Sequence, residues 1–260
     1  MNNNNKKKNK TVLITGATGD LGHEFVKGFS KLGFNILFTS RNSQKSKKLI
    51  QFAKKNGCKK IHDIQIDLED IYSVKKIIQK IKKLELYPDI LINNARDKKN
   101  LAINSRGIVE RDEWISEFTI NLIVPYELSI KLASLSKSKL KNIINISSIY
   151  GVVAPNINIY NNSKKESAIN YGTVKAAIIH LTKELAVRLA NKKITVNSIS
   201  FGGVKGKQNK LFQKKYASLS PQKKMLSKNE VFGAIKFLTS NDSTAINGQN
   251  IIVDGGWTLW

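Results

Sequence analysis

The residues best suited to do chemistry are Tyr171 and Lys175, which lie four positions apart. Side chains at this spacing share one face of a helix, so the two should point the same way. A nearby ammonium stabilises a phenolate, which makes Tyr171 a candidate general acid or base. The same spacing recurs at Tyr160 and Lys164, so the spacing alone does not choose between the two pairs.

Two more polar side chains are candidates for the same site. Ser148 follows an apolar, β-branched run over 142–146, and a hydroxyl there can donate to a carbonyl oxygen as charge develops on it. Asn121 lies in an apolar part of a helix expected over 110–135, which Pro125 should end or kink. An asparagine whose amide only satisfies hydrogen bonds within the fold would explain Asn121 as well as a functional asparagine would.

A glycine-rich turn near the start of the chain suits a dinucleotide. It follows a short strand expected over 11–15 and precedes a helix expected over 23–32, the context that a dinucleotide-binding motif requires. Such glycines permit a tight turn, close approach to a diphosphate and close packing of helix on strand. An ordinary strand-to-helix turn is the alternative. The cofactor contacts expected here come from Gly16, Thr18, Gly19, Asp20, Leu21 and Gly22.

The end of the second expected strand, 34–39, bears on the choice of cofactor. An acidic residue there would accept a hydrogen bond from a ribose 2′-hydroxyl, but the chain has Ser40 and Arg41. Arginine pairs with a 2′-phosphate, so we expect NADP(H), with NAD(H) and a merely solvated Arg41 as alternatives. Cofactor contacts at later strand ends are expected from Asp67, Leu68, Asn93, Ala95, Gly202 and Val204.

The elements that must position these residues alternate along the chain. Further strands are expected over 60–66, 89–92, 142–146, 194–199 and 250–253, and helices over 43–56, 71–86, 110–135, 176–189 and 229–238. This alternation predicts one Rossmann-type α/β domain over 11–260, a doubly wound parallel sheet of about seven strands with helices on both faces. Ligands bind such sheets at the carboxyl ends of the strands.

Three irregular segments complete the organisation. The Asn- and Lys-rich stretch 1–10 is expected to be a disordered tail. The stretch 149–170, with no clear periodicity, is expected to be a substrate lid, and the basic stretch 205–227 a second substrate-side region.

The composition of the chain limits which classes of binding partner we expect. The formal net charge is +25, but lysines are spread over nearly every expected element and no recognition module is present, so we expect no nucleic-acid partner. No run of 18 apolar residues exists, so no membrane span is expected. The lone Cys58 and the lack of a Cys/His cluster predict no metal and a reducing, cytoplasmic compartment.

Taken together, these motifs resemble the short-chain dehydrogenase/reductase family over nearly the whole chain. The matching residues are Thr15, Gly16, Gly19, Gly22, Asp67, Asn93-Asn94-Ala95, Asn121, Ser147-Ser148, Tyr171, Lys175, Val196-Asn197 and Asp254-Gly255-Gly256. The family places its lysine just over twenty residues before the Val-Asn pair. Lys175 lies 22 positions before Asn197 and Lys164 lies 33, so the resemblance selects Tyr171 and assigns Tyr160 to the lid.

The resemblance implies a role for each residue. Tyr171 would exchange a proton with the substrate oxygen, and Lys175 would stabilise its phenolate and hold the nicotinamide ribose. Ser148 would bind the reacting oxygen, and Asn121 would support a water that relays protons to Lys175. The family is usually a homotetramer or homodimer built through its two long central helices.

Departures from the family pattern and a closer resemblance bear on the substrate. Asp20 and Phe201 replace a usual glycine and proline, and Arg96 replaces a glycine where it could crowd the nicotinamide or bind an anion.

The stretch from Ser147 to Asn156 is similar to a bacterial subgroup linked to flagellin and surface-polysaccharide sugars. This implies a sugar-derived carbonyl or alcohol, with substrate contacts expected from Arg96, Tyr150 and Tyr160. A 3-oxoacyl thioester reductase and a non-catalytic NADP-binding regulator are the alternatives.

Overall fold

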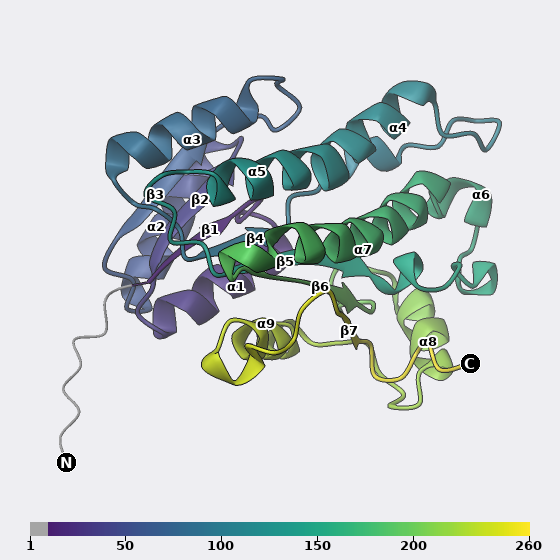
Figure 1. Cartoon of the computed structure of the whole chain (residues 1–260). Helices are drawn as coiled ribbons and strands as arrows, with labels where there is room; N and C mark the ends of the chain where they lie inside the picture. Colours follow the sequence, from purple (N-terminus) through teal and green to yellow (C-terminus); the bar gives the residue numbers. More distant parts are fainter. Residues whose placement is uncertain (1–9) are drawn as a thin grey trace, which may run out of the picture.

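The computed structural model describes residues 10–260, so the tail expected over 1–10 lies outside it except for its last residue. Seven strands form one sheet in the order β3-β2-β1-β4-β5-β6-β7, and every neighbouring pair is parallel (Figure 1). The strands are β1 Thr11–Ile14, β2 Asn35–Ser40, β3 Ile61–Gln65, β4 Ile90–Asn93, β5 Asn142–Ser148, β6 Thr195–Phe201 and β7 Asn250–Val253. This confirms the expected sheet, and the strand order reverses direction between β1 and β4, where ligands bind in such folds.

Helices cover both faces of the sheet, as expected. All residues of β1, β2 and β4 are buried, which is typical of strands covered on both sides. On one face α1 (Asp20–Lys31), α2 (Ser43–Lys55) and α9 (Phe232–Leu238) pack against Val12 and Ile14. On the other face α3 (Ser73–Leu84), α5 (Val124–Ala133) and α7 (Ile169–Leu189) pack against Leu13 (Figure 1).

The helix expected over 110–135 is divided into three parts. It runs as α4 (Arg111–Phe118), a π-helical turn η2 (Thr119–Ile123) and then α5. The N–H of Val124 donates to the carbonyl of Thr119, five residues earlier, and Pro125 has no N–H to offer the carbonyl of Asn121. Single π turns within α-helices are frequent at functional sites, and this one contains Asn121.

The helix that carries Tyr171 starts earlier than expected. We expected it over 176–189, but α7 begins at Ile169, so Tyr171 and Lys175 are both helical. Gly172 allows α7 to pack closely on the segment that follows β5. A Cβ added at Gly172 would lie 2.9 Å from the carbonyl oxygen of Tyr150.

The two segments expected on the substrate side pack on each other. The first contains short turns η3 (Ile149–Gly151) and η4 (Ile157–Ile159) and helix α6 (Ser163–Glu166), so it is less irregular than expected. The second contains α8 (Lys210–Leu219). Ile149, Ile159, Tyr216, Met225 and Trp257 form a small separate core between them. The remaining 3₁₀ turns are η1 Lys99–Leu101, η5 Ala190–Lys192, η6 Lys228–Glu230 and η7 Asn241–Ser243.

A matched pair of glycine substitutions tests the packing of α1 on the sheet. A Cβ at Gly22 would lie 2.6 Å from the Cα of Ala17 and 2.6 Å from the carbonyl oxygen of Gly16, whereas at Gly233 in α9 it would meet nothing within 4 Å. We expect Gly22→Ala to lower the free energy of unfolding by about 2 kcal/mol through overpacking. Gly233→Ala should raise it by about 0.5 kcal/mol through higher helix propensity. Urea denaturation of each variant measures both, and equal effects at the two sites would contradict the packing described.

Candidate active site

Lys175 is held by two acceptors from different elements. The residue is 5% exposed, and its Nζ donates to Asn121 Oδ1 at 2.8 Å and to the carbonyl oxygen of Ile146 at 3.0 Å. Burial lowers the pKa of Lys175 to about 8, the nearby Glu117 carboxyl acts in the opposite direction, and Arg96 lowers it further. An ammonium has three N–H donors, so these two bonds leave one for another partner.

Glu117 lies one turn before Asn121 and is fully buried. Its carbonyl oxygen accepts from Asn121 Nδ2 at 3.1 Å, while neither carboxyl oxygen has a hydrogen-bond partner among the residues described. Burial raises the pKa of Glu117, and Lys175 and Arg96 counteract this. The amide of Asn121 therefore connects the buried lysine to the turn that carries a buried acid.

Tyr171 lies in the first turn of α7 and is half-buried. The Arg96 guanidinium lies 5.1 Å from the centre of its ring, and Lys175 Nζ lies 5.8 Å from that centre. Tyr150 meets the ring edge-on, with 6.4 Å between ring centres. The phenol of Tyr171 is thus placed beside two cations.

The two serines at the end of β5 have different roles. Ser147 Oγ donates to the carbonyl oxygen of Lys175 at 2.8 Å, which ties the strand to α7. Ser148 Oγ accepts from the N–H of Tyr150 at 3.2 Å, which leaves its own O–H to donate. A Cβ at Gly151 would lie 2.5 Å from the Lys175 carbonyl oxygen, so this segment lies directly on α7. The structure brings Ser148, Tyr171 and Lys175 to one strand end.

The glycine-rich turn is fixed by the neighbouring strand. Gly16 has a φ of +64°, and a Cβ there would lie 2.7 Å from the Cα of Ala95. Thr15 Oγ1 accepts from the N–H groups of Asn94 and Ala95 at 3.0 Å each. Asn94 Nδ2 donates to the carbonyl oxygens of Thr15 and Gly16 at 2.9 and 3.1 Å.

These features fit a bound diphosphate. The turn leaves room only for glycine at Gly16, and α1 begins at Asp20, directly after the turn. Within α1, Gly22 also has no room for a side chain. The first N–H groups of a helix have no partner within it and attract anions. Thr18 lies in the turn, and Leu21 packs on the core. Asp20 is exposed and forms an ion pair with Lys228 at 3.2 Å.

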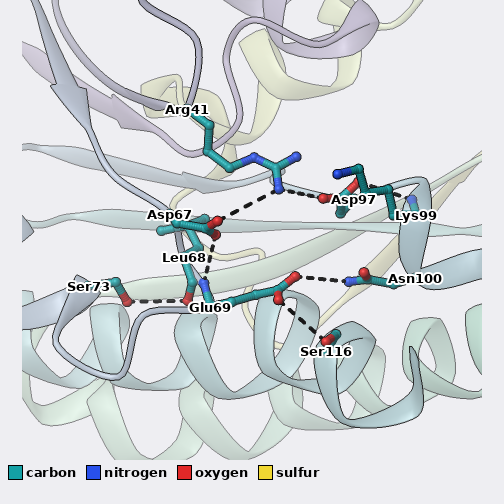
Figure 2. A network of polar contacts seen from close by, with 9 residues as sticks. All are labelled: Arg41, Asp67, Leu68, Glu69, Ser73, Asp97, Lys99, Asn100 and Ser116. Carbon is teal, nitrogen blue, oxygen red and sulfur yellow. Dashed lines mark hydrogen bonds and ion pairs between the residues drawn. The ribbon is translucent and has the colours of Figure 1, made fainter. Parts of the chain in front are cut away.

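Arg41 follows β2 and meets carboxylates from two further strand ends. Its Nη1 donates to Asp97 Oδ2 at 2.5 Å and lies 4.0 Å from Asp67 Oδ2 (Figure 2). Asp67 also accepts the N–H of Glu69 at 3.1 Å, and the neighbouring Leu68 is 7% exposed.

Some expected cofactor residues are engaged within the protein. The hydroxyl of Ser40 shares a hydrogen bond with Ser46 and donates to Asp63 at 3.2 Å. Asn93 Nδ2 donates to Asn145 Oδ1 at 2.8 Å, which joins β4 to β5 inside the sheet. The side chains of Ser40 and Asn93 thus already have hydrogen-bond partners within the protein.

The turn after β6 is also tightly packed. The N–H of Gly202 donates to the carbonyl oxygen of Val253 at 2.9 Å, and a Cβ there would lie 2.9 Å from the Tyr216 hydroxyl. Val204 and Leu226 form an isolated parallel β-bridge, which joins the two ends of the segment 205–227.

Sequence reasoning missed three residues. Asn94 belongs to the Asn93-Asn94-Ala95 motif that matches the family, but only its two neighbours were expected to contact the cofactor. Asp97 and Glu117 carry no local signal, because only the tertiary structure brings them to Arg41 and Lys175.

Aromatic side chains cluster where the substrate is expected to bind. Tyr160 donates its hydroxyl to Tyr150 at 2.9 Å and packs on Phe212, with 5.6 Å between ring centres. Tyr150 meets Trp257 edge-on at 6.1 Å. Burial raises the pKa of Tyr150 and of Tyr160, so neither hydroxyl is suited to release a proton. Arg96 is exposed beside this cluster, on the ring of Tyr171.

Other kinds of site are not found in the part described. Within residues 10–260 no three His, Cys, Asp or Glu side chains gather to hold a metal ion. None of the described helices is long and apolar enough to cross a bilayer. A surface hollow of about 920 Å³ lies between the second half of α7, residues 247–250 and the pair Gly151 and Val152.

Comparisons with known proteins agree with this geometry. Residues 16–258 match the family model described as enoyl-(acyl carrier protein) reductase. The chain is 32% identical over 253 residues to the 3-oxoacyl-(acyl-carrier-protein) reductase FabG of Buchnera aphidicola subsp. Schizaphis graminum, covering 95% of this chain and 96% of that protein. It is 28% identical over 257 residues to post-translational flagellin modification protein A of Campylobacter coli, and the match covers 96% of this chain and 99% of that protein.

A solved structure is similar over the whole length. The 4-hydroxyisoleucine dehydrogenase complexed with NADH superposes with a TM-score of 0.83 at 28% identity, covering 97% of this chain and 100% of that one. The family match, the parallel sheet and the Ser148, Tyr171 and Lys175 arrangement agree. The chain belongs to the short-chain dehydrogenase/reductase family, as an oxidoreductase that uses a nicotinamide cofactor.

Proposed function

We propose that the protein transfers hydride between NADP(H) and a sugar-derived carbonyl/alcohol pair, in the synthesis of surface or flagellar glycans. The observation that carries the catalytic part is the buried Lys175, held by Asn121 and Ile146 beside Tyr171. This arrangement lies at the same strand edge as the glycine-rich turn, so one dinucleotide can reach both.

Each residue has a role in the proposed reaction. The nicotinamide supplies or accepts the hydride. Tyr171 gives a proton to the substrate oxygen in reduction and takes it back in oxidation, and the free O–H of Ser148 donates to that oxygen. Lys175 stabilises the phenolate of Tyr171 and offers its remaining N–H to the cofactor ribose. Asn121 keeps Lys175 in place.

The substrate proposal is supported by the residues around Tyr171 and by one relative. Tyr150, Tyr160 and Trp257 offer aromatic faces and hydroxyls that suit a polyhydroxylated ring, and Arg96 suits an anionic group on it. The flagellin modification protein of Campylobacter coli is 28% identical to this chain. The second candidate, a 3-oxoacyl thioester, is favoured by the 32% identity to a 3-oxoacyl reductase.

The cofactor preference is proposed from Arg41, which stands at the end of β2 where an acid would favour a ribose hydroxyl. We propose that the adenosine is also contacted by residues that follow β3 and β4 at the same edge of the sheet, namely Asp67, Leu68 and Ala95. NAD(H) is the competing cofactor, since the similar 4-hydroxyisoleucine dehydrogenase is complexed with NADH.

We also propose a homodimer or homotetramer in the cytoplasm. Ile123, Tyr126, Ile169 and Val187 are exposed apolar residues on or beside α5 and α7, the helices through which the family assembles. Cys58, the single cysteine of the chain, is buried, which suits a reducing compartment.

Removing the hydroxyl of Tyr171 tests the mechanism. We expect Tyr171→Phe to lower kcat by about 100-fold or more, because general acid–base catalysis of the proton transfer is lost. The matched control Tyr160→Phe removes a hydroxyl that bonds Tyr150, so it should change KM more than kcat. NADPH oxidation measured over a panel of keto-sugars and 3-oxoacyl thioesters gives both values and identifies the substrate class.

Two outcomes of this assay would count against the proposal. Full activity of Tyr171→Phe would refute the mechanism. Turnover of 3-oxoacyl thioesters with none of the keto-sugars would replace the proposed substrate class by the second candidate.

The pKa of Lys175 predicts how the rate depends on pH. Since burial lowers this pKa to about 8, Lys175 is an ammonium below that pH and loses its charge above it, so kcat/KM should fall as pH rises through about 8. The Glu117 carboxyl raises the pKa of Lys175, so Glu117→Gln should move this fall to lower pH. Glu113→Gln, one turn earlier in α4, serves as the control. An identical pH profile for all three proteins would show that Glu117 does not act on Lys175.

The cofactor proposal predicts a change in preference on removing Arg41. A charge-assisted contact is worth about 1.5 kcal/mol or more, so Arg41→Ala should weaken NADPH binding about tenfold with little effect on NADH. Fluorescence titration with each cofactor measures this, and an unchanged ratio of the two dissociation constants would contradict a role for Arg41.

A further inference from the structure

The ion pair between Arg41 and Asp97 crosses the cofactor edge of the sheet. Arg41 follows β2 and Asp97 follows β4, and β1 lies between those two strands. The ion pair, drawn in Figure 2, therefore joins the ends of the two strands on either side of β1, the strand that leads into the glycine-rich turn. A dinucleotide bound at that turn must share the edge with this ion pair.

Asp97 is an ionised carboxylate with little access to water. Its side chain is 9% exposed, against 47% for that of Arg41. Burial alone would raise the pKa of Asp97, but the bonds from Arg41 and from the N–H of Lys99 outweigh this, and the pKa is lowered. Asp67 and Glu69 add two more carboxylates near the same guanidinium. The Arg41 guanidinium thus faces three carboxylates, and the charge of Lys99 also acts on Asp97.

Asp97 is held in a fixed place. The 3₁₀ turn η1 begins two residues later, and its Asn100 accepts from Asn170 Nδ2 at 2.8 Å through its carbonyl oxygen. Asn170 directly precedes Tyr171 in α7. The segment that carries Asp97 is therefore tied to the catalytic helix, so the carboxylate has little freedom to move away from a ligand.

Asp97 makes binding of a 2′-phosphate less favourable whichever way Arg41 points. If Arg41 turns to the phosphate, a buried carboxylate loses its partner, which is destabilising. If Arg41 stays on Asp97, the phosphate enters beside like charges. A 2′-hydroxyl avoids both costs, because it can donate to a carboxylate.

We propose that Asp97 is a specificity-determining residue that weakens binding of the 2′-phosphate of NADP(H) and so limits the preference that Arg41 gives. The inference rests on the proposed placement of the cofactor adenosine at Arg41. Cofactor preference then depends on two residues with opposite effects: Arg41 after β2 favours the 2′-phosphate, and Asp97 after β4 disfavours it.

Binding of cofactor fragments that cannot react tests this directly. ADP-ribose and 2′-phospho-ADP-ribose are titrated by calorimetry into the full-length protein, Asp97→Asn and the control Asp70→Asn. Asp70 is a carboxylate near the end of β3 that pairs with Lys76 instead of Arg41. Asp97→Asn should bind 2′-phospho-ADP-ribose roughly fivefold more tightly relative to ADP-ribose, the effect of about one charge contact. Asp70→Asn should leave the ratio unchanged.

The other outcomes are also decisive. An unchanged ratio in Asp97→Asn, or the same shift in Asp70→Asn, would overturn the inference. If circular dichroism shows that Asp97→Asn does not fold, Asp97→Ser gives the same comparison. Binding of neither fragment by the unchanged protein would overturn the proposed function, and this inference with it.

Discussion

The buried ammonium of Lys175 is the constraint on which the site depends. A charge at 5% exposure is stable only when acceptors surround it, and the protein supplies them from two elements, Asn121 in the π turn and the carbonyl of Ile146 in β5. Pro125 and the π turn place Asn121, Ser147 ties β5 to α7, and Gly151 permits the close contact. Disturbing any of these elements would displace Lys175 and, one turn away, Tyr171.

The local charge at the site differs from that of the chain. The formal net charge is +25, yet the edge that would receive the adenosine has one arginine among three carboxylates, and a fourth acid, Glu117, lies buried behind Lys175. Overall charge therefore says little about which cofactor binds. The carboxylates around Arg41 and the buried carboxyl of Glu117 set the electrostatic environment of the two ends of the site.

Much of this arrangement could be predicted from the sequence, because the information was local. Alternating apolar runs predicted the sheet and the helices on its faces. The choice of Tyr171 over Tyr160 came from the resemblance to the family, through the position of Lys175 relative to Asn197. The early start of α7 was missed because the stretch 149–170 shows no clear apolar periodicity, although α7 begins at Ile169. Ser40 lies at the expected strand end with its hydroxyl engaged by Ser46. Asp97 and Glu117 could not be foreseen, since their partners are distant in sequence.

The charge state of Lys175 is the most direct test of this account. Titration of the protein labelled with carbon-13 at lysine Cε, followed by NMR and assigned with Lys175→Arg, reports that ammonium separately from the exposed lysines. The account predicts that the Lys175 signal titrates near pH 8, because burial outweighs the attraction of Glu117. Titration near the ordinary lysine value of about 10.4 would contradict it.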